Sequence, residues 1–296
     1  MPPSGLHLAR DHDHNAVAAH VRRDEWERLS RGAYGATAAR WGRKERALAK
    51  ARAVHERLVT PHWFSHETAA LIWGLPVWQV PDVTHLRRRG RAGTGRDRSV
   101  ARHAGELDER HLTVVGHLPV TDLEQTMVDC ARSLSPLGGL VVADAALRAG
   151  ADRGTALAIL DAEPGRRGVA RATAVIELAD EGAESPGETV TRYVLLREGL
   201  PQPQTQIPVV TRLGTFWADL GWEEWRVFLE YDGRVKYADT EAWVREKRRH
   251  DAVVETGAHM LRVTKEDIPQ RAGLAARALR LLPAGIARVN RPLLRG

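Results

Sequence analysis

One stretch of twenty residues, ADLGWEEWRVFLEYDGRVKY (218–237), constrains the fold and function of this chain more than any other. Its pattern is that of two strands joined by a tight reversal, with acids inside otherwise apolar runs. A carboxylate in a buried strand is costly unless another group compensates its charge. A divalent metal ion is one such group, and metal-bound carboxylates support phosphodiester hydrolysis. The stretch therefore predicts a metal-binding hairpin.

The residues on both sides of this hairpin predict an α+β unit. SPGETVTRYVLLREGL (185–200) has Ser185 as helix cap and Glu188 in position to close a capping box. Strand patterns follow the helix, and a basic helix and a short strand complete the unit. The expected elements are a helix over 185–200, strands over 205–210, 214–222 and 225–233, a helix over 240–256 and a strand over 259–264.

The geometry of the hairpin depends on the length of its loop. A loop of two or four residues centred on Glu223-Glu224 places Asp219 opposite Phe228, with Asp219, Glu230 and Asp232 on one face of the sheet. Diagonal neighbours lie about 7–8 Å apart or less, so their carboxylates can share one cation. An odd-length loop would break this parity.

Two further residues complete the predicted metal site. Lys236 follows the second strand and is expected to orient an attacking water or to stabilise developing charge. Glu188 is expected to complete the metal shell, although a capping role alone would explain it. The alternative is that the hairpin acids face solvent or pair with Arg192, Arg245 or Arg248.

Composition and length limit the classes of protein that need to be considered. The chain has 296 residues, 43% of them hydrophobic and 28% charged, which is ordinary for one or two globular domains. No apolar run is long enough to span a bilayer and no signal peptide is evident, so we expect a cytoplasmic protein without membrane contact. Cys130, the single cysteine, excludes an intrachain disulfide and is expected to be a buried thiol.

Arginine clusters favour a polyanionic partner. The formal net charge is +6, residues 85–103 hold seven arginines and one acid, and residues 271–296 hold six arginines and no acid. Such blocks suit phosphate contacts, although a solvated arginine-rich surface would look the same. The side chains expected to bind nucleic acid are Arg87, Arg88, Arg89, Arg91, Arg245 and Arg248.

The first two thirds of the chain predict mostly helices with a few short strands. WERLSRGAYGA (26–36) is typical of a strand or wing, and helices are expected near 44–58, 65–73, 121–134, 138–149, 154–163 and 168–181. The helix over 121–134 opens with a Thr-x-x-Glu capping box at Thr121. His62 and His66 lack an intervening glutamate and an evident third ligand, so they are expected to lie at the surface or to cap a helix.

The segment from Glu184 to Ile268 resembles the PD-(D/E)XK nuclease superfamily, and in particular its very-short-patch-repair endonuclease-like branch. The resemblance is carried by ESPGE (184–188), ADLGW (218–222), EYDGRVKY (230–237), WVREKRRHDAVVETG (243–257) and HMLRVT (259–264). It implies an α-β-β-β-α-β core in which Asp219, Glu230 and Glu188 bind Mg²⁺. The lysine that the family carries two residues after the second acid is replaced by Asp232, and Lys236 follows four residues later.

The front of the chain resembles the N-terminal half of AbiEi-type antitoxin-like proteins. WERLSRGAYG (26–35), FSHETAALIWGLPVW (64–78), LPVTDLEQTMVDCARSL (118–134) and ADAALRAG (143–150) carry this likeness. It implies a DNA-binding winged helix at the start of the chain. The helix that would read DNA, near 11–25, is short and rich in histidine, so the winged helix is degenerate.

Together these observations predict an α/β fold of the α+β kind, with a mainly helical N-terminal region that has a degenerate winged-helix start. The expected divisions are an AbiEi-like region over 1–165, a restriction-endonuclease-like domain over 166–270 and a basic tail over 271–296. We expect a DNA-associated, Mg²⁺-dependent endonuclease-like protein with a partner in a defence or toxin–antitoxin system. The alternative is a non-catalytic DNA-binding regulator or antitoxin-like protein with an inactive nuclease fold.

Overall fold

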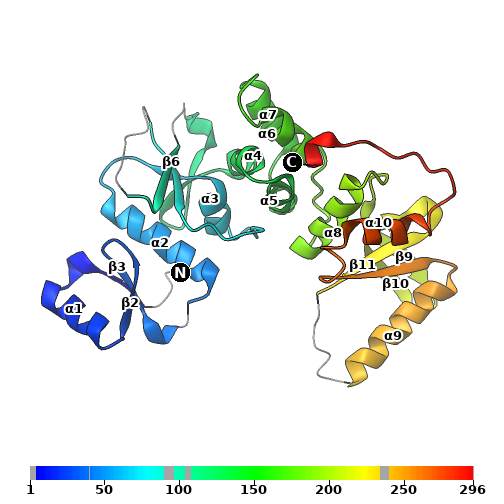
Figure 1. Cartoon of the computed structure of the whole chain (residues 1–296), viewed down its shortest axis with the longest axis horizontal. Helices are drawn as coiled ribbons and strands as arrows, with labels where there is room; N and C mark the ends of the chain where they lie inside the picture. The colour runs from blue at the N-terminus through cyan, green and yellow to red at the C-terminus, as the bar shows by residue number, and fades with distance from the viewer. Residues whose placement is uncertain (1–4, 40, 90–96, 104–107, 234–239, 296) are drawn as a thin grey trace.

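The computed structural model describes residues 5–39, 41–89, 97–103, 108–233 and 240–295. They form a mixed α/β structure with three sheets. Figure 1 shows two sheets in the N-terminal part of the chain and the third in the C-terminal part. The helices α4 (Leu123–Ser133) and α5 (Pro136–Arg148) lie between them. The mixed α/β class that the sequence predicts is therefore confirmed.

The first sheet has the strand order β1-β3-β2 and carries the helix α1. Its hairpin coincides with the segment expected to form strands, and His20 stacks on the ring of Trp26 with the centroids 4.2 Å apart. A long helix, α2, then leads to the second sheet. The bounds are β1 Leu6–Leu8, η1 Ala9–Asp11, α1 His14–Arg22, β2 Trp26–Ser30, β3 Ala33–Ala36, η2 Thr37–Ala39 and α2 Arg43–Arg57.

The second sheet has five strands in the order β6-β5-β4-β8-β7. Its core consists of buried apolar residues such as Phe64, Leu86 and Val120, and α2 and α3 pack against it. β5 and β6 are parallel, with His85 beside Ala101 and Arg87 beside His103. The bounds are β4 Trp63–Phe64, α3 His66–Ile72, β5 Thr84–Arg87, β6 Val100–His103, η3 Glu109–His111, β7 Leu112–Val115 and β8 Leu118–Thr121.

The middle of the chain is helical, as its periodicity predicts. Its helices are α4 Leu123–Ser133, α5 Pro136–Arg148, α6 Arg153–Asp161 and α7 Val169–Glu177. Asp122 caps α4, because its carboxylate accepts the N–H of Gln125 at 2.8 Å. The predicted cap at Thr121 is therefore wrong by one residue, since the Thr121 hydroxyl pairs with the hydroxyl of Thr126 instead. Cys130 is fully buried in α4, as expected.

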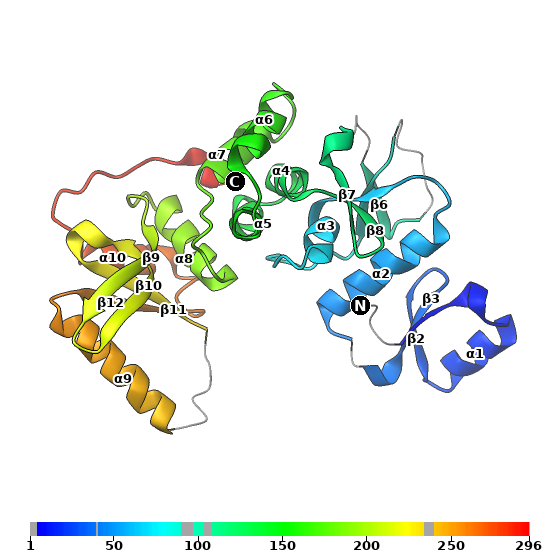
Figure 2. The same ribbon diagram turned by 180° about the vertical axis from the view of Figure 1, so that it is seen from behind.

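The third sheet has the strand order β12-β11-β10-β9. β9, β10 and β11 are antiparallel, whereas β11 and β12 are parallel. The helices α8 and α10 pack on one face of this sheet and α9 packs on the other (Figure 2). Along the chain, the elements α8 to β12 follow one another in the expected order α-β-β-β-α-β. The bounds are α8 Pro186–Arg197, β9 Gln204–Thr211, β10 Gly214–Trp222, η4 Glu223–Trp225, β11 Val227–Asp232, α9 Thr240–Glu255, β12 His259–Thr264 and α10 Arg271–Leu279.

The end of the chain packs back onto α8. A 3-10 turn, η5 (Pro292–Leu294), buries Leu294, whose carbonyl accepts the hydroxyl of Tyr193 at 2.7 Å. Arg291 donates to the carbonyls of Leu196 and Leu200, at the carboxyl end of α8. This basic segment thus uses some of its arginines inside the protein, where they complement the negative end of a helix.

One hydrophobic core connects the central helices to the C-terminal sheet. It runs from Met127 and Leu140, through Ile176 and Leu195, to Leu229 in β11. Residues on both sides of the expected boundary between 165 and 166 contribute side chains to this core. A separate core on the other face of the sheet lies under α9.

Gly221 is expected to be intolerant of any side chain because β10 and β11 are in close contact there. A Cβ at Gly221 would lie 2.3 Å from the carbonyl oxygen of Val227 and 2.9 Å from the Cα of Phe228. Both are backbone atoms, so Gly221→Ala should lower the free energy of unfolding, measured in urea, by about 3 kcal/mol. Gly273→Ala is the control, since its Cβ meets only Gln270 at 3.8 Å, and should stabilise by about 0.5–1 kcal/mol. Equal stability of the two variants would contradict this close contact.

Candidate functional sites: an acidic hairpin and a histidine cluster

The hairpin of β10 and β11 is formed as predicted, but its register differs by two residues. Leu220 pairs with Leu229, Gly221 with Phe228 and Trp222 with Val227. The expected pairing of Asp219 with Phe228 is therefore wrong. The loop has four residues, 223–226, but it begins with a 3-10 turn and ends at Arg226 with a φ of 53°, which moves its centre along the chain. The parity is unchanged, and the next step of the register would place Asp219 beside Glu230.

Asp219 lies where the ladder between β10 and β11 ends. Its Oδ2 accepts the backbone N–H of Tyr231 at 2.7 Å, in place of a carbonyl from the neighbouring strand. Burial raises the pKa of Asp219, while the N–H of Tyr231 and the charge of Arg249 lower it and the charge of Glu184 raises it. Asp219 is therefore a partly buried acid whose charge interacts with Glu184, just before α8, and with Arg249 in α9.

Glu188 lies in the first turn of α8 and is 8% exposed. Its carboxylate accepts the N–H of Glu184 and the hydroxyl of Ser185, each at 2.8 Å. Ser185 is confirmed as the cap, because its Oγ accepts the N–H of Glu188 at 3.2 Å. Burial raises the pKa of Glu188, and the negative charge of Asp219 raises it further. A carboxylate has about four acceptor positions, so these bonds leave room for a further ligand.

Glu230 forms an ion pair with Arg249, which belongs to α9. The sequence predicts Arg192, Arg245 or Arg248 as the partner of the hairpin acids. The observed partner of Glu230, Arg249, is the residue after Arg248. Arg192 is instead fully buried and pairs with Asp144 in α5 at 2.6 Å. Lys236, the predicted assisting group, lies outside the described residues.

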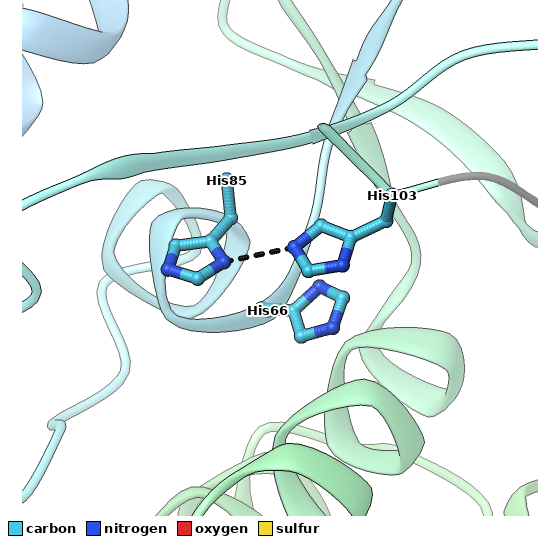
Figure 3. Close-up of side chains that lie close together, drawn as sticks. All are labelled: His66, His85 and His103. Atoms are coloured by element: carbon cyan, nitrogen blue, oxygen red, sulfur yellow. Dashed lines mark hydrogen bonds between the residues drawn. The ribbon is translucent and has the colours of Figure 1, made fainter. Parts of the chain in front are cut away.

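The charge of Asp219 acts on Glu188, but the three predicted metal ligands Asp219, Glu188 and Glu230 are not gathered into a tight cluster. Among the described residues, one group of three or more candidate ligand side chains has its ligand atoms within 4.8 Å of one another, and it lies elsewhere. That group is His66, His85 and His103 (Figure 3).

The histidine cluster joins the second sheet to α3. His85 and His103 lie on the same face of the parallel strands β5 and β6, and His85 Nδ1 is 3.0 Å from His103 Nε2. His66 is the first residue of α3, and its ring stacks on that of His103 with the centroids 3.8 Å apart. The expectation that His62 and His66 lie at the surface or cap a helix is wrong, because they are only 5% and 6% exposed and the N-cap of α3 is Ser65.

Carboxylates surround the histidine cluster. His66 Nδ1 is 2.9 Å from the hydroxyl of Ser65 and 3.6 Å from Asp129 Oδ2, and His85 Nε2 is 3.9 Å from Glu67 Oε2. Burial lowers the pKa of His66 to about 3 despite the opposing charge of Asp129. Burial also lowers the pKa values of His85 and His103. The three rings are therefore neutral at pH 7 and retain lone pairs for binding.

A cavity of about 880 Å³ opens beside this cluster. Its wall includes His66 and His103 together with a belt of arginines and the start of α7. The lining residues are His66, Arg87, His103, Asp129, Arg132, Ser133, Glu163, Gly165, Arg166, Arg167, Gly168, Val169, Ala170 and Arg171.

The arginines predicted to bind nucleic acid have different surroundings. Arg87 is largely buried in an ion pair with Asp129, so its charge is neutralised within the protein. Arg89 pairs with Glu109 at the surface, and Arg88 is half-buried. Arg245 and Arg248 are exposed on α9. Arg91 lies outside the described residues.

The proteins to which this chain is similar are themselves uncharacterized. No protein-family model matches the chain. It is similar to two uncharacterized proteins of Mycobacterium tuberculosis, from strains CDC 1551 / Oshkosh and ATCC 25618 / H37Rv. Each is 33% identical over 160 residues, which are 53% of this chain and 59% of the relative. The matched part is thus less than two thirds of either relative.

None of the described helices combines the length and the apolar character that crossing a bilayer requires.

Proposed function

We propose that the C-terminal sheet and its flanking helices form a metal-dependent nuclease site that hydrolyses phosphodiester bonds in DNA. The observation that carries the proposal is the position of Asp219. It is a partly buried acid at the end of the ladder between β10 and β11, and its charge acts on a buried acid, Glu188. Two carboxylates out of water repel each other, and a divalent cation between them would relieve both penalties.

The donor set suits a hard cation. Asp219, Glu188 and Glu230 offer only carboxylate oxygens, which Mg²⁺ prefers. When bound there, Mg²⁺ would polarise a phosphoryl oxygen and lower the pKa of an attacking water. Arg249 would keep Glu230 in place through their ion pair. Lys236 would orient the water.

The cationic face of α9 supports a polyanionic substrate. Arg245 and Arg248 are exposed on this helix, which covers the sheet face toward which Glu230 points. Contacts of such side chains with phosphates would hold the DNA backbone near the acids. A genetic or physical partner in a defence or toxin–antitoxin system would fit this activity.

A second candidate function is DNA binding without cleavage. The ion pair between Glu230 and Arg249 favours it, because the arginine already neutralises one proposed metal ligand. Asp232 at the position of the family's lysine favours it as well. In this case the protein would act as a regulator or antitoxin-like protein, with the first sheet and α1 as a degenerate winged helix.

Metal dependence separates the two functions. The full-length protein is incubated with supercoiled plasmid in Mg²⁺, in Ca²⁺ and in EDTA, and DNA binding is measured in parallel at two salt concentrations. The nuclease proposal expects nicked or linear product in Mg²⁺ and none in EDTA. Salt-sensitive binding with no product under any condition would reject the nuclease and support the regulator.

A further inference from the structure

We propose that His66, His85 and His103 form a binding site for a transition-metal ion, Zn²⁺, separate from the acidic hairpin. The three side chains come from two strands and a helix start, yet one ring nitrogen of each lies within 4.8 Å of the others (Figure 3). Three neutral imidazoles are a ligand set suited to zinc, whereas Mg²⁺ prefers oxygen. The site holds whether or not the hairpin acids cleave DNA.

The surroundings of two rings match the outer shell of a zinc site. Metal-bound histidines usually donate their other N–H to a carboxylate or another acceptor, which fixes the ring and its tautomer. Ser65 and Asp129 lie beside Nδ1 of His66, which leaves Nε2 for the metal. Glu67 lies beside Nε2 of His85, which leaves Nδ1, and that atom faces His103.

Glu67 is hard to explain without such a role. Its Oε2 is buried and makes no hydrogen bond, although an unpartnered buried carboxylate oxygen is costly. His85 Nε2 lies 3.9 Å from this oxygen, too far for a hydrogen bond. A small rotation of His85 toward a bound ion could close this gap and satisfy Glu67.

The backbone at His66 is also strained. His66 has a φ of 54°, in the left-handed region that non-glycine residues rarely occupy. Such strain is often retained at functional positions, where it fixes the direction of a side chain. Here it places the ring of His66 over that of His103.

The present ring positions need only modest adjustment to bind a metal. Tetrahedral Zn–N bonds of about 2.0–2.1 Å place ligand nitrogens roughly 3.4 Å apart. The pair formed by His85 and His103 is already at 3.0 Å. The rings of His66 and His103 are within 20° of parallel, so one must turn. Both line the cavity, which gives room for this rotation, a path for the ion and a fourth position for water.

Zinc titration of the chelator-treated full-length protein tests this inference. Calorimetry should give one tight site per chain, and Zn²⁺ should raise the midpoint of thermal unfolding. His103→Ala should weaken binding at least tenfold and remove the thermal shift. Bound Co²⁺ should show the visible absorption of a tetrahedral site in the wild type and lose it in His103→Ala.

Three variants identify the site. His259→Asn changes an exposed histidine in β12 and should leave binding unchanged. Asp219→Asn should also bind zinc normally, because the hairpin is a different site. His85→Asn repeats the test on the second strand in case His103→Ala does not fold. Wild type without a tight site, or cluster variants that fold and bind as tightly as the wild type, would overturn the inference.

Discussion

Asp219→Asn is expected to lower the rate of Mg²⁺-dependent plasmid cleavage by about 100-fold or more while leaving the protein folded. The loss follows from the removal of a charged metal ligand, which contributes several kcal/mol to the stabilisation of charge in the transition state. The fold should survive because an asparagine carbonyl can still accept the N–H of Tyr231. Asp219→Ala would remove that acceptor as well, so a loss of metal binding could not be separated from a loss of stability.

The measurement is the rate of plasmid cleavage by the wild type and by Asp219→Asn, prepared in the same way. Glu224→Gln is the control, since it makes the same chemical change on the same hairpin at an exposed loop position. It should cleave at the wild-type rate. If Asp219→Asn cleaves as fast as this control, the activity belongs to another group or to a contaminant, and the nuclease proposal fails.

Arg192→Ala is expected to reduce the free energy of unfolding by about 3–5 kcal/mol, the usual cost of breaking a buried ion pair. Arg192 is fully buried and donates to both carboxylate oxygens of Asp144, at 2.6 and 2.8 Å. Burial already raises the pKa of Asp144, and Arg192 opposes that shift. Without the guanidinium, a carboxylate would remain in the core with only the hydroxyl of Thr189 and the N–H of Asp180.

Urea unfolding followed by tryptophan fluorescence measures this effect, and two further variants interpret it. Arg212→Ala breaks an exposed pair with Glu255, in which both side chains are more than half exposed, and should change stability by less than about 1 kcal/mol. Asp144→Asn combined with Arg192→Ala should recover part of the loss, because the neutral amide still offers an acceptor. If Arg192→Ala and Arg212→Ala lower the free energy of unfolding equally, burial of the ion pair between Arg192 and Asp144 does not increase the cost of breaking it.

The elements of this chain could be predicted from local sequence because their signals are local. Ser185 and Pro186 start a helix, and HMLRVT forms a strand over the range expected. The register of the hairpin was predicted less well. Its apolar pattern fixes which face a residue occupies, since the period is two, but a shift by two residues preserves the pattern. The left-handed turn at Arg226 decided the outcome.

The histidine cluster could not be found from spacing. His66, His85 and His103 are brought together by the parallel pairing of β5 with β6 and by the packing of α3, which are contacts distant in sequence. The pair formed by His62 and His66 was the more visible pattern, but a two-residue strand separates them, so they do not share a helix face. Similarly, the sequence places Arg87 in a basic block, but its ion pair with Asp129 depends on a contact distant in sequence.

The continuous core determines how the protein can be divided for experiments. A fragment that starts at residue 166 would contain every element of the C-terminal sheet, yet it would lack Met127 and Leu140, which share that core. It would also leave Arg192 without Asp144. Removal of the last few residues would similarly expose Tyr193. A loss of activity or solubility in such fragments would therefore report damage to the core, and only full-length variants can show which residues act on a substrate.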